Sequence, residues 1–336
     1  MELFGRDLNR EVALVAEIGV NHEGDPDTAM KLLHLASEAH ADAVKFQSYT
    51  PERYASASDP VRLERVKRFS LSEETHQHLA AEARELGIAF FSTPLTEDFV
   101  PILSELCPVI KIASGDLTFE PVIRSAARTG KPVILSTGLG TIDDVDRAVQ
   151  WCRDEIGDEE LRNRLVLLHC VSAYPTPIRE ANILSIPYLA ERYGVMVGYS
   201  NHVIGWEACA AAVALGARVV EVHFTDQKTG RDFRDHELSF EHADLKQLRQ
   251  TIDNIASSLG VRDKIIMPSE AVNLQAARKG IVASRDIPAG TTLAREDMMF
   301  ARPATEFGSG EIGDVVGKTL NCAIERGNLI PRDAVH

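Results

Sequence analysis

The sequence lacks the features of a disulfide-bonded, secreted or membrane-spanning protein. Its five cysteines are odd in number and form no Cys-x-x-Cys pair. Neither a disulfide framework nor a cysteine-based zinc site is therefore expected. The sequence instead favours a reducing, cytoplasmic location. The first six residues contain no apolar leader that would indicate a signal peptide. The most apolar stretch, around residues 208–224, is interrupted by Arg218 and Glu221, so no transmembrane helix is expected either.

Basic residues are scarce relative to acidic ones. The 336 residues include 36 Lys and Arg against 50 Asp and Glu, which gives a net charge of −14. Nucleic acids and anionic membranes bind basic faces, so neither is expected as the main partner. The balance still allows a small anionic substrate that is held by a few local lysines. With 44% hydrophobic and 26% charged residues, the chain has the composition of a globular protein.

Short apolar runs alternate with amphipathic helical patterns over the first 260 residues. The runs predict strands at residues 12–18, 43–46, 88–91, 109–112, 132–135, 165–168, 195–199 and 219–222. None alternates strictly with polar residues, which is typical of parallel strands buried on both faces. Eight strand–helix units in about 260 residues predict an α/β fold, a (β/α)₈ TIM barrel. A doubly wound sheet is the alternative, although Asn21-His-Glu-Gly24 after the first strand is not a dinucleotide-binding fingerprint.

Helix signals separate the predicted strands. One helix is expected to open at Asp25-Pro26, where a capping residue precedes a first-turn proline. Ser70-Leu-Ser-Glu73 resembles a capping box for a helix over residues 76–86, which Gly87 would end. Further helices are expected near residues 97–106, 121–127, 142–155, 183–193, 206–215 and 241–259.

The pattern changes after Gly260. Residues 261–276 have little periodicity and are interpreted as a linker between a barrel domain over residues 1–260 and a second domain over residues 277–336. Short apolar runs between turns, such as Gly280-Ile-Val-Ala-Ser284, predict that the second domain is β-rich. About 60 residues make a small core, so this domain is expected to lean on the barrel or on a partner subunit.

Two histidines stand at the ends of neighbouring predicted strands. His202 ends the run Val197-Gly-Tyr-Ser-Asn-His202, and His223 ends Val219-Val-Glu-Val-His223. Because the active site of a barrel enzyme lies at the carboxyl ends of its strands, two imidazoles there can bind one divalent metal and leave positions open for a substrate. The alternative is that each is a structural histidine with satisfied hydrogen bonds.

Two lysines lie within or directly after apolar runs and are expected to be buried. A buried lysine needs an anion, so Lys45 and Lys111 pair either with a carboxylate such as Glu17 or with a phosphate or carboxylate of a ligand. Hydroxyl donors stand at the same strand ends: Thr93, Ser114 and Ser136. The turn Ser136-Thr-Gly-Leu-Gly-Thr141 is either an anion-binding turn or an ordinary helix-entry loop.

A polar loop follows the eighth predicted strand. It carries Asp232 and Asp235, within Gly230-Arg-Asp-Phe-Arg-Asp-His-Glu237. Loops after barrel strands commonly carry specificity, so these carboxylates are candidates for a lid that contacts sugar hydroxyls. A solvated loop is the alternative.

Together these motifs resemble the sialic acid (N-acetylneuraminate) synthase family of nonulosonate synthases over essentially the full length. They are Ala16-Glu-Ile-Gly-Val-Asn-His-Glu-Gly24, Val44-Lys-Phe-Gln47, Phe91-Ser-Thr-Pro94, Lys111-Ile-Ala-Ser-Gly115, Lys131-Pro-Val-Ile-Leu-Ser-Thr-Gly138, Leu168-His-Cys170, Tyr174-Pro-Thr-Pro177, Gly198-Tyr-Ser-Asn-His202 and Glu221-Val-His-Phe-Thr-Asp226. The tail resembles the family's antifreeze-like (SAF) domain, through Asp286-Ile-Pro-Ala-Gly290, Arg302-Pro303 and Val316-Gly-Lys318. The resemblance implies a TIM barrel followed by a small SAF domain.

The resemblance also implies a carbon–carbon bond-forming transferase. Phosphoenolpyruvate (PEP) would condense with the open-chain aldehyde of an N-acylated hexosamine, water would enter at C2 of PEP, and phosphate would leave. The product would be a nine-carbon 2-keto-3-deoxy acid. The family uses Mn²⁺ or Mg²⁺ and forms domain-swapped homodimers, in which the tail of one chain covers the barrel mouth of the other.

Site residues follow from the same resemblance. His202 and His223 would bind the metal, which polarises the aldehyde oxygen, and Glu17 would act on protons or water near the reacting carbons. The expected PEP contacts are Lys45, Thr93, Lys111, Ser114, Ser136, Ser172 and Ser200. The expected sugar contacts are Gln47, Asp116, Tyr174, Asp235 and, from the tail of the other chain, Arg302.

Three features depart from the family pattern. Asp116 stands where Glu is usual, Ser172 where some members have Asn, and Ala304-Thr-Glu-Phe-Gly308 replaces a Gly-rich continuation. These positions lie mostly on the sugar side, so N-acetylmannosamine and a diacetamido-trideoxy-hexose are both candidate acceptors. Two other functions stay open: a metal-dependent aldolase or lyase that does not use PEP, and a sugar-acid-binding protein without turnover.

Overall fold

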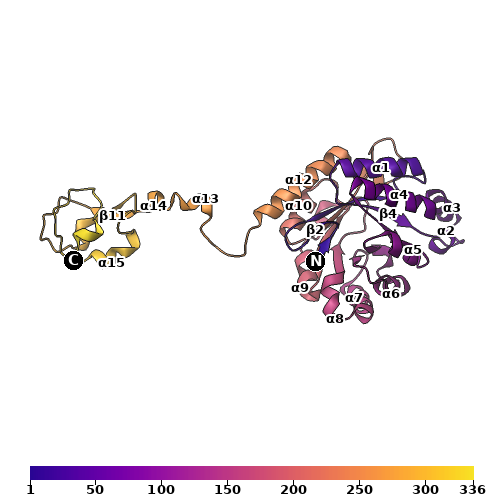
Figure 1. Ribbon diagram of the computed structural model, residues 1–336, viewed down its shortest axis with the longest axis horizontal. Helices are drawn as coiled ribbons and strands as arrows, with labels where there is room; N and C mark the ends of the chain where they lie inside the picture. The colour runs from indigo at the N-terminus through magenta and orange to yellow at the C-terminus, as the bar shows by residue number, and fades with distance from the viewer. The chain divides into compact units, whose positions relative to one another are not determined.

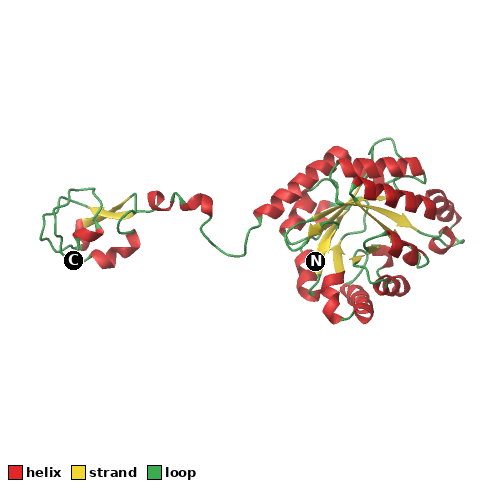
Figure 2. Ribbon diagram, in the orientation of Figure 1, coloured by secondary structure: helices red, strands yellow, loops and turns green.

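The chain folds into two compact units. A computed structural model describes all 336 residues and divides them into Met1–Gly260 and Val261–His336 (Figure 1). Strands fill the centre of the first unit and helices surround them (Figure 2). No helix has both the length and the apolarity needed to cross a membrane.

The first unit is a parallel eight-stranded barrel. Its strands are β3 (Ala13–Gly19), β4 (Ala43–Ser48), β5 (Ala89–Pro94), β6 (Ile110–Ile112), β7 (Val133–Ser136), β8 (Leu165–His169), β9 (Met196–Asn201) and β10 (Val219–His223). The last strand, β10, pairs with the first, β3, and this pairing places His223 beside Glu17. The eight predicted strands and the TIM barrel are therefore confirmed. A doubly wound sheet is excluded, because its first and last strands do not join in this way.

Helices cover the outside of the barrel. They are α1 (Pro26–Glu38), α2 (Pro51–Tyr54), α3 (Pro60–Phe69), α4 (Glu73–Leu86), α5 (Phe99–Leu106), α6 (Glu120–Arg128), α7 (Ile142–Ile156), α8 (Asp158–Arg164), α9 (Ser185–Tyr193), α10 (Glu207–Ala214), α11 (Asp235–Leu238) and α12 (His242–Ser258). Asp25 caps α1 and Gly87 ends α4 in the left-handed conformation, as predicted. Helices α2, α3, α8 and α11 were not predicted.

The predicted cap of the helix over residues 76–86 is wrong by two residues. The capping side chain is Ser72, whose Oγ accepts a hydrogen bond of 3.1 Å from the backbone N–H of Thr75. Ser70 instead ends the preceding helix, α3. Because Ser70 and Ser72 both stand just before the acidic first turn, the sequence pattern fits either residue.

The amino ends of the strands are closed by the start of the chain. Strands β1 (Glu2–Leu3) and β2 (Arg6–Asp7) form a short antiparallel hairpin. Asp42 lies directly before β4 and binds two arginines. Its Oδ1 accepts from Arg6 Nε over 2.8 Å, and its Oδ2 accepts from Arg249 of α12 over 2.8 Å. This buried ion cluster closes one end, and the polar side chains gather at the carboxyl ends of the strands.

A separate hydrophobic cluster lies at the carboxyl end of the barrel. It is formed by Val20, Tyr49, Ala55, Val66, Phe69 and Leu95, and Tyr54, Leu63, Ala113 and Phe233 pack against it. We call these ten residues the mouth cluster. They come from the loops after β3, β4, β5, β6 and β10 and from helices α2 and α3, so α3 is held by the cluster rather than by the barrel core.

One glycine permits this arrangement. Gly24 has φ of +89°, and a Cβ atom there would collide with the carbonyl oxygen of Arg68 near the end of α3. Only glycine therefore lets the loop after β3 contact α3 so closely. This contact is a structural reason for the last residue of the motif Asn21-His-Glu-Gly24.

The second unit is small and contains little regular structure. Strands β11 (Gly280–Ala283) and β12 (Met298–Ala301) pair antiparallel, and further isolated bridges join the loops. Short helices α13 (Pro268–Ala271), α14 (Leu274–Ala277) and α15 (Ile312–Val315) accompany them. Its core is a cluster of its own, around Ile281, Leu293 and Ile330. Residues 261–276, which were interpreted as a linker, thus contain the short helix α13 and most of α14.

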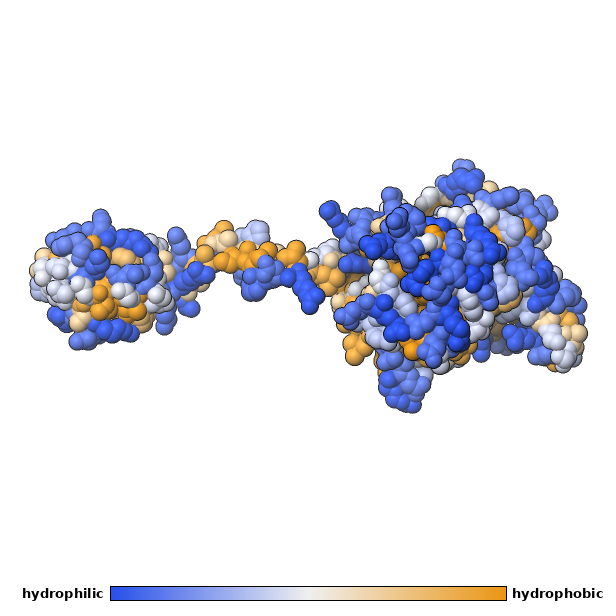
Figure 3. Space-filling view, turned by 90° about the horizontal axis from the view of Figure 1, so that it is seen from below, coloured by the Kyte–Doolittle hydropathy of each residue, from blue (hydrophilic) through white to orange (hydrophobic).

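The start of the second unit exposes apolar side chains. Val261, Ile265, Ile266, Met267 and Val272 are all between 45% and 81% exposed. They contribute to the hydrophobic surface along this segment, which is orange in Figure 3. A run of exposed aliphatic side chains commonly marks a surface that another chain covers.

Candidate active site

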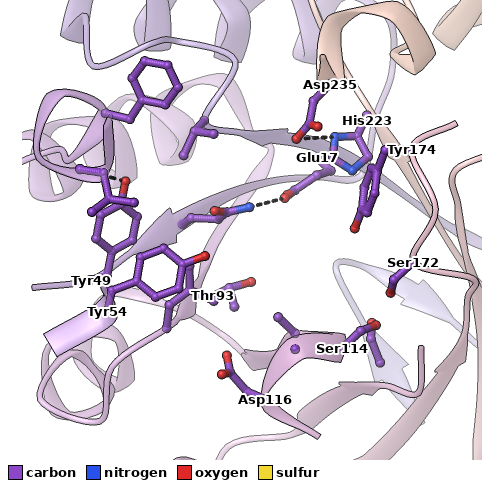
Figure 4. Close-up of a pocket in the computed structure, with 18 of the residues that line it drawn as sticks. Glu17, Tyr49, Tyr54, Thr93, Ser114, Asp116, Ser172, Tyr174, His223 and Asp235 are labelled. Carbon is purple, nitrogen blue, oxygen red and sulfur yellow. Dashed lines mark hydrogen bonds and ion pairs between the residues drawn. The ribbon is translucent and has the colours of Figure 1, made fainter. Parts of the chain in front are cut away.

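The carboxyl ends of the barrel strands surround one pocket of about 900 Å³ (Figure 4). All but one of the site residues predicted from the sequence line it: Glu17, Lys45, Gln47, Thr93, Lys111, Ser114, Asp116, Ser136, Ser172, Tyr174, Ser200, His202, His223 and Asp235. Arg302 belongs to the second unit, where its Nε donates to the carbonyl oxygen of Ala277 over 2.6 Å.

The two lysines are buried, as expected, but they have different partners. Lys45 is 4% exposed, and its Nζ lies 2.7 Å from Glu17 Oε2 and 4.0 Å from Glu221 Oε2. Lys111 is 2% exposed and donates to the carbonyl oxygen of Ile112 over 2.8 Å and to Ser136 Oγ over 2.6 Å. No carboxylate lies within ion-pairing distance of Lys111. The carboxylate alternative therefore holds for Lys45, whereas Lys111 has its charge available for an anion from outside the protein.

Burial and mutual charge set the protonation of this cluster. Burial raises the pKa of Glu17 to about 7, although Lys45 opposes the shift. Burial acts in the same direction on Glu221, but Lys45, Lys111 and a hydrogen bond from Ser200 outweigh it and lower the pKa of Glu221. Burial lowers the pKa of Lys111. Glu17 is thus the carboxyl group that can gain and lose a proton near pH 7.

Hydroxyl groups converge beside Lys111. The backbone N–H of Gly138 donates to Ser114 Oγ over 3.1 Å, and Ser172 Oγ is buried without a partner. A Cβ atom on Gly138 would lie 2.5 Å from Ser172 Oγ and 2.8 Å from Ser114 Oγ, so glycine is required for this convergence. The far end of the same turn is a helix entry, because Thr141 Oγ1 accepts from Asp144 N–H and caps α7.

The two histidines lie together and are neutral at pH 7. Their ring centroids are 5.3 Å apart. Burial lowers the pKa of His202 to about 4 and that of His223 to about 3. His202 Nδ1 lies 2.7 Å from the carbonyl oxygen of Val171 and must donate to it, so the lone pair of this ring is on Nε2. His223 Nδ1 is buried and has no hydrogen-bond partner.

These features fit a metal ligand pair better than two structural histidines. His76, a structural histidine of the barrel, uses both ring nitrogens, with Ser48 Oγ and the carbonyl oxygen of Ser72. His22 has a buried Nε2 without a partner, so it is the pairing of His202 with His223 in the pocket that distinguishes these two rings. Neutral imidazoles with free lone pairs are the form that binds divalent metals. No group of three or more His, Cys, Asp or Glu side chains is arranged to hold a metal, so further ligands would have to come from substrate or water.

The side chains expected to contact the sugar surround the histidines. The ring centroids of Tyr174 and His202 are 4.2 Å apart, and Arg234 Cζ lies over the ring of Tyr174, 4.8 Å from its centroid. Asp235 Oδ1 and Asp116 Oδ2 are buried and make no hydrogen bond, although Asp235 Oδ1 lies 3.4 Å from Arg234 Nε and Asp235 Oδ2 lies 3.9 Å from His223 Nδ1. Burial raises the pKa of Asp116 to about 6, against the opposing charge of Lys111. Of the two loop carboxylates, Asp235 is buried and Asp232 is exposed.

The structure gives a place in the site to residues whose role the sequence does not show. Glu221 accepts from Ser200 Oγ over 2.8 Å and faces both lysines. Glu221 lies two residues before His223 in the same strand, and this spacing places both side chains on one face of the sheet. This spacing is the sequence signal for Glu221. Tyr49, Tyr54 and Phe69 of the mouth cluster also line the pocket. The segment that carries α2 and α3 is rich in charge and gave no such signal.

Some polar residues at the strand ends hold loops instead of lining the pocket. Asn21 Nδ2 donates to the carbonyl oxygen of Phe224 over 2.9 Å and to Ser239 Oγ over 3.0 Å, so it fixes the loop after β10. His22 Nδ1 accepts from the backbone N–H of Gly24 over 3.0 Å. These two residues support the site by positioning its loops.

A polar pocket at the carboxyl end of a (β/α)₈ barrel defines the class of a TIM-barrel enzyme. Residues 32–264 match the model of the NeuB family, and residues 278–335 match that of the SAF domain. The chain therefore belongs to the NeuB family of nonulosonic acid synthases and carries a C-terminal SAF domain, as the sequence motifs predicted.

Individual relatives support this assignment. The chain is 34% identical to the N,N'-diacetyllegionaminic acid synthase of Campylobacter jejuni, over 96% of this chain and 99% of that protein. It is 31% identical to the mouse N-acetylneuraminate-9-phosphate synthase, over 96% and 92%. The structure is similar to that of the sialic acid synthetase of Leptospira borgpetersenii in complex with citrate, with a TM-score of 0.74, 31% identity and coverage of 79% and 90%.

The charge cluster makes one testable prediction about stability. Replacing Glu221 by Gln leaves two buried lysines opposite a single carboxylate, so the free energy of unfolding should fall by about 3 kcal/mol. Urea unfolding of Glu221→Gln against wild type measures this change, and Glu237→Gln, at an exposed position of α11, is the matched control. Unchanged stability of Glu221→Gln would contradict the assigned charge balance.

Proposed function

We propose that the chain condenses PEP with the aldehyde of an N-acylated hexosamine and releases inorganic phosphate. The observation that carries the proposal is Lys111, a buried ammonium group with no carboxylate partner beside converging hydroxyls. Such a group needs an anion. The acceptor is N-acetylmannosamine or a diacetamido-trideoxy-hexose, and the product is a nine-carbon 2-keto-3-deoxy acid. The legionaminic acid and N-acetylneuraminate-9-phosphate synthases to which the chain is similar make products of this class.

The deep part of the pocket suits PEP, which carries a phosphate and a carboxylate. Lys45 and Lys111 supply charge, and hydroxyl groups supply hydrogen bonds from Thr93, Ser114, Ser136, Ser172 and Ser200. In a site that excludes water, each of these contacts is stronger than in solution. The pocket volume of about 900 Å³ also leaves room for a second substrate beside PEP.

The proposed reaction requires groups that move protons to the aldehyde oxygen and from the attacking water. C3 of PEP attacks the aldehyde carbon, a carbon–carbon bond forms, and the aldehyde oxygen takes a proton. Water then adds to C2, and the bond from C2 to the phosphate oxygen breaks. Glu17, with a pKa raised to about 7 by burial, can hold a proton or take one from water at neutral pH. Its Oε2 lies 2.7 Å from Lys45 Nζ, which fixes its position.

His202 and His223 would hold a divalent cation, Mn²⁺ or Mg²⁺. When bound, the cation supplies Lewis-acid polarisation of the aldehyde oxygen. The neutral state of both rings and the unpartnered Nδ1 of His223 support this assignment. Gln47, Asp116, Tyr174 and Asp235 surround the remaining space and would contact the hydroxyl and acyl groups of the sugar.

A phosphate-release assay tests the reaction. Purified protein with Mn²⁺ and PEP should release phosphate only when an acylated hexosamine is present, with mannose and arabinose 5-phosphate as controls. Release from PEP alone, or from none of the acceptors, would reject the synthase. Carbon–carbon cleavage of a sugar acid without PEP would favour the aldolase or lyase alternative, and binding without turnover would favour the sugar-acid-binding alternative.

The metal assignment predicts the behaviour of His202→Ala. This variant should lose metal affinity and lower metal-dependent turnover roughly 100-fold, because one of two protein ligands is removed. Calorimetric titration with Mn²⁺ measures binding independently of activity, and circular dichroism checks the fold. His78→Ala, at an exposed position of α4, is the matched control. Normal Mn²⁺ affinity of His202→Ala would mean that the metal site is elsewhere.

We further propose a domain-swapped homodimer, in which Arg302 of one chain contacts the sugar bound in the barrel of the other. Five exposed apolar residues at the start of the second unit support association, because a row of exposed aliphatic side chains is commonly covered by another surface: Val261, Ile265, Ile266, Met267 and Val272. Arg302 supplies a cationic donor that an anionic or polyhydroxylated substrate can use.

Arg302→Ala should raise the KM for the sugar about 10-fold and leave the KM for PEP unchanged, since one charged hydrogen bond is lost. Arg326→Ala is the control at another exposed arginine of the same unit. Mixing Arg302→Ala with His202→Ala chains gives a sharper test. A swapped dimer regains one barrel with both residues and hence a normal sugar KM, whereas an unswapped protein does not.

A further inference from the structure

Three neighbouring strands of the barrel end around one glycine. Strand β7 pairs with β6 on one side and with β8 on the other, so Ser114, Gly138 and Cys170 come together directly after these strands. A Cβ atom on Gly138 would lie 2.8 Å from Cys170 Sγ and 2.8 Å from Ser114 Oγ. The thiol therefore belongs to the same cluster as the hydroxyls beside Lys111, although the proposed reaction gives it no part.

Cys170 contacts Ser114 directly. Its Sγ lies 2.9 Å from Ser114 Oγ, and either atom can be the donor. The backbone N–H of Gly138 donates to the same Oγ over 3.1 Å. Ser114 lines the pocket, whereas Cys170 is only 5% exposed and does not line it. An effect of the thiol on a ligand in this pocket must therefore pass through Ser114.

The thiol keeps its proton at neutral pH. Burial raises the pKa of Cys170 above its usual value, although Ser114, Lys111 and the backbone N–H of Gly138 oppose the shift. A protonated thiol is a weak hydrogen-bond donor, and its sulfur is a weak acceptor. The S–H group of Cys170 is therefore available to donate to Ser114 Oγ.

The hydroxyl of Ser114 has one hydrogen to donate and two lone pairs that accept. When the N–H of Gly138 and the S–H of Cys170 both donate to Oγ, the lone pairs are occupied and the hydrogen is left for a ligand. An anionic oxygen holds this hydrogen more strongly than sulfur does, because a hydrogen bond to a charged acceptor is about twice as strong as a neutral one. Without the S–H donor, one lone pair of Ser114 is free to face the anion and repel it.

We propose that Cys170 is a positioning residue, which occupies a lone pair of Ser114 Oγ so that the Ser114 hydroxyl donates to an anionic oxygen of PEP. This inference rests on the proposed function and adds a residue to its PEP subsite. Ser172, whose Oγ is buried without a partner, lies on the same side of the pocket as Ser114 and supplies a second hydroxyl (Figure 4). A packing role is the alternative, because a free cysteine commonly serves as a small buried apolar side chain.

Kinetics of two variants separate the roles. Cys170→Ala should raise the KM for PEP about 5-fold and leave kcat and the KM for the acceptor unchanged, because one hydrogen bond is lost from the PEP subsite alone. Cys170→Ser keeps a donor at this place and should stay within about 2-fold of wild type. Cys152→Ala is the matched control, since Cys152 of α7 is also buried and does not line the pocket. An unchanged KM for PEP in Cys170→Ala, or equal losses in both variants, would leave a packing role and overturn the inference.

A double-mutant cycle tests whether Cys170 acts through Ser114. Ser114→Ala removes the hydroxyl and should raise the KM for PEP by itself. In that background, Cys170→Ala should add less than about 2-fold, because both changes remove parts of one contact. The full 5-fold effect of Cys170→Ala in the absence of the Ser114 hydroxyl would show that the thiol acts by another route.

Infrared spectroscopy tests the contact in the unaltered PEP complex. The S–H stretching band that is absent from Cys170→Ser should lie at the lowered frequency of a hydrogen-bonded thiol. A band at the frequency of a free thiol would overturn the inference, even where Cys170→Ala does not fold. Calorimetric titration of wild type with PEP keeps the two proposals apart, because a protein that does not bind PEP rejects the proposed function itself.

Discussion

The buried charges at the barrel mouth are the constraint on which the site depends. Two lysines and two carboxylates lie out of water, and only Lys45 has a close carboxylate partner, Glu17 at 2.7 Å. Isolated buried charge is costly, so the protein must surround Lys111 with a carbonyl oxygen and Ser136. The same requirement explains why hydroxyls gather there and why Gly138, which leaves room for them, cannot be larger.

The barrel supplies this arrangement through its register. Pairing of β10 with β3 sets His223 beside Glu17, and pairing of β3 with β4 sets Glu17 beside Lys45. Three residues far apart in the chain thus become neighbours by backbone hydrogen bonds alone. Loops then complete the pocket, and Asn21 ties the loop after β3 to the loop after β10. The rigid sheet fixes the charges, and the loops add specificity.

The parts of the site that could be predicted from the sequence are those carried by the strands. A lysine inside an apolar run, or a histidine at its end, marks a polar group that the sheet points into the barrel mouth, as Lys111 and His202 do. Helix α3 could not be predicted, because its own pattern is mostly charged and only Val66 and Phe69 are buried, by residues distant in sequence. Glu221 stands at a predicted strand end, but its role depends on Lys45, Lys111 and Ser200, which only the fold brings beside it.

The net charge of the chain limits how the protein can attract an anionic substrate. A protein with a net charge of −14 does not attract PEP over long distances, and salt screens such attraction within about 10 Å. Binding must then come from short-range contacts whose strength depends on exclusion of water. Burial of Lys45 and Lys111 meets this need, because both ammonium groups lie out of bulk water at the carboxyl ends of the strands.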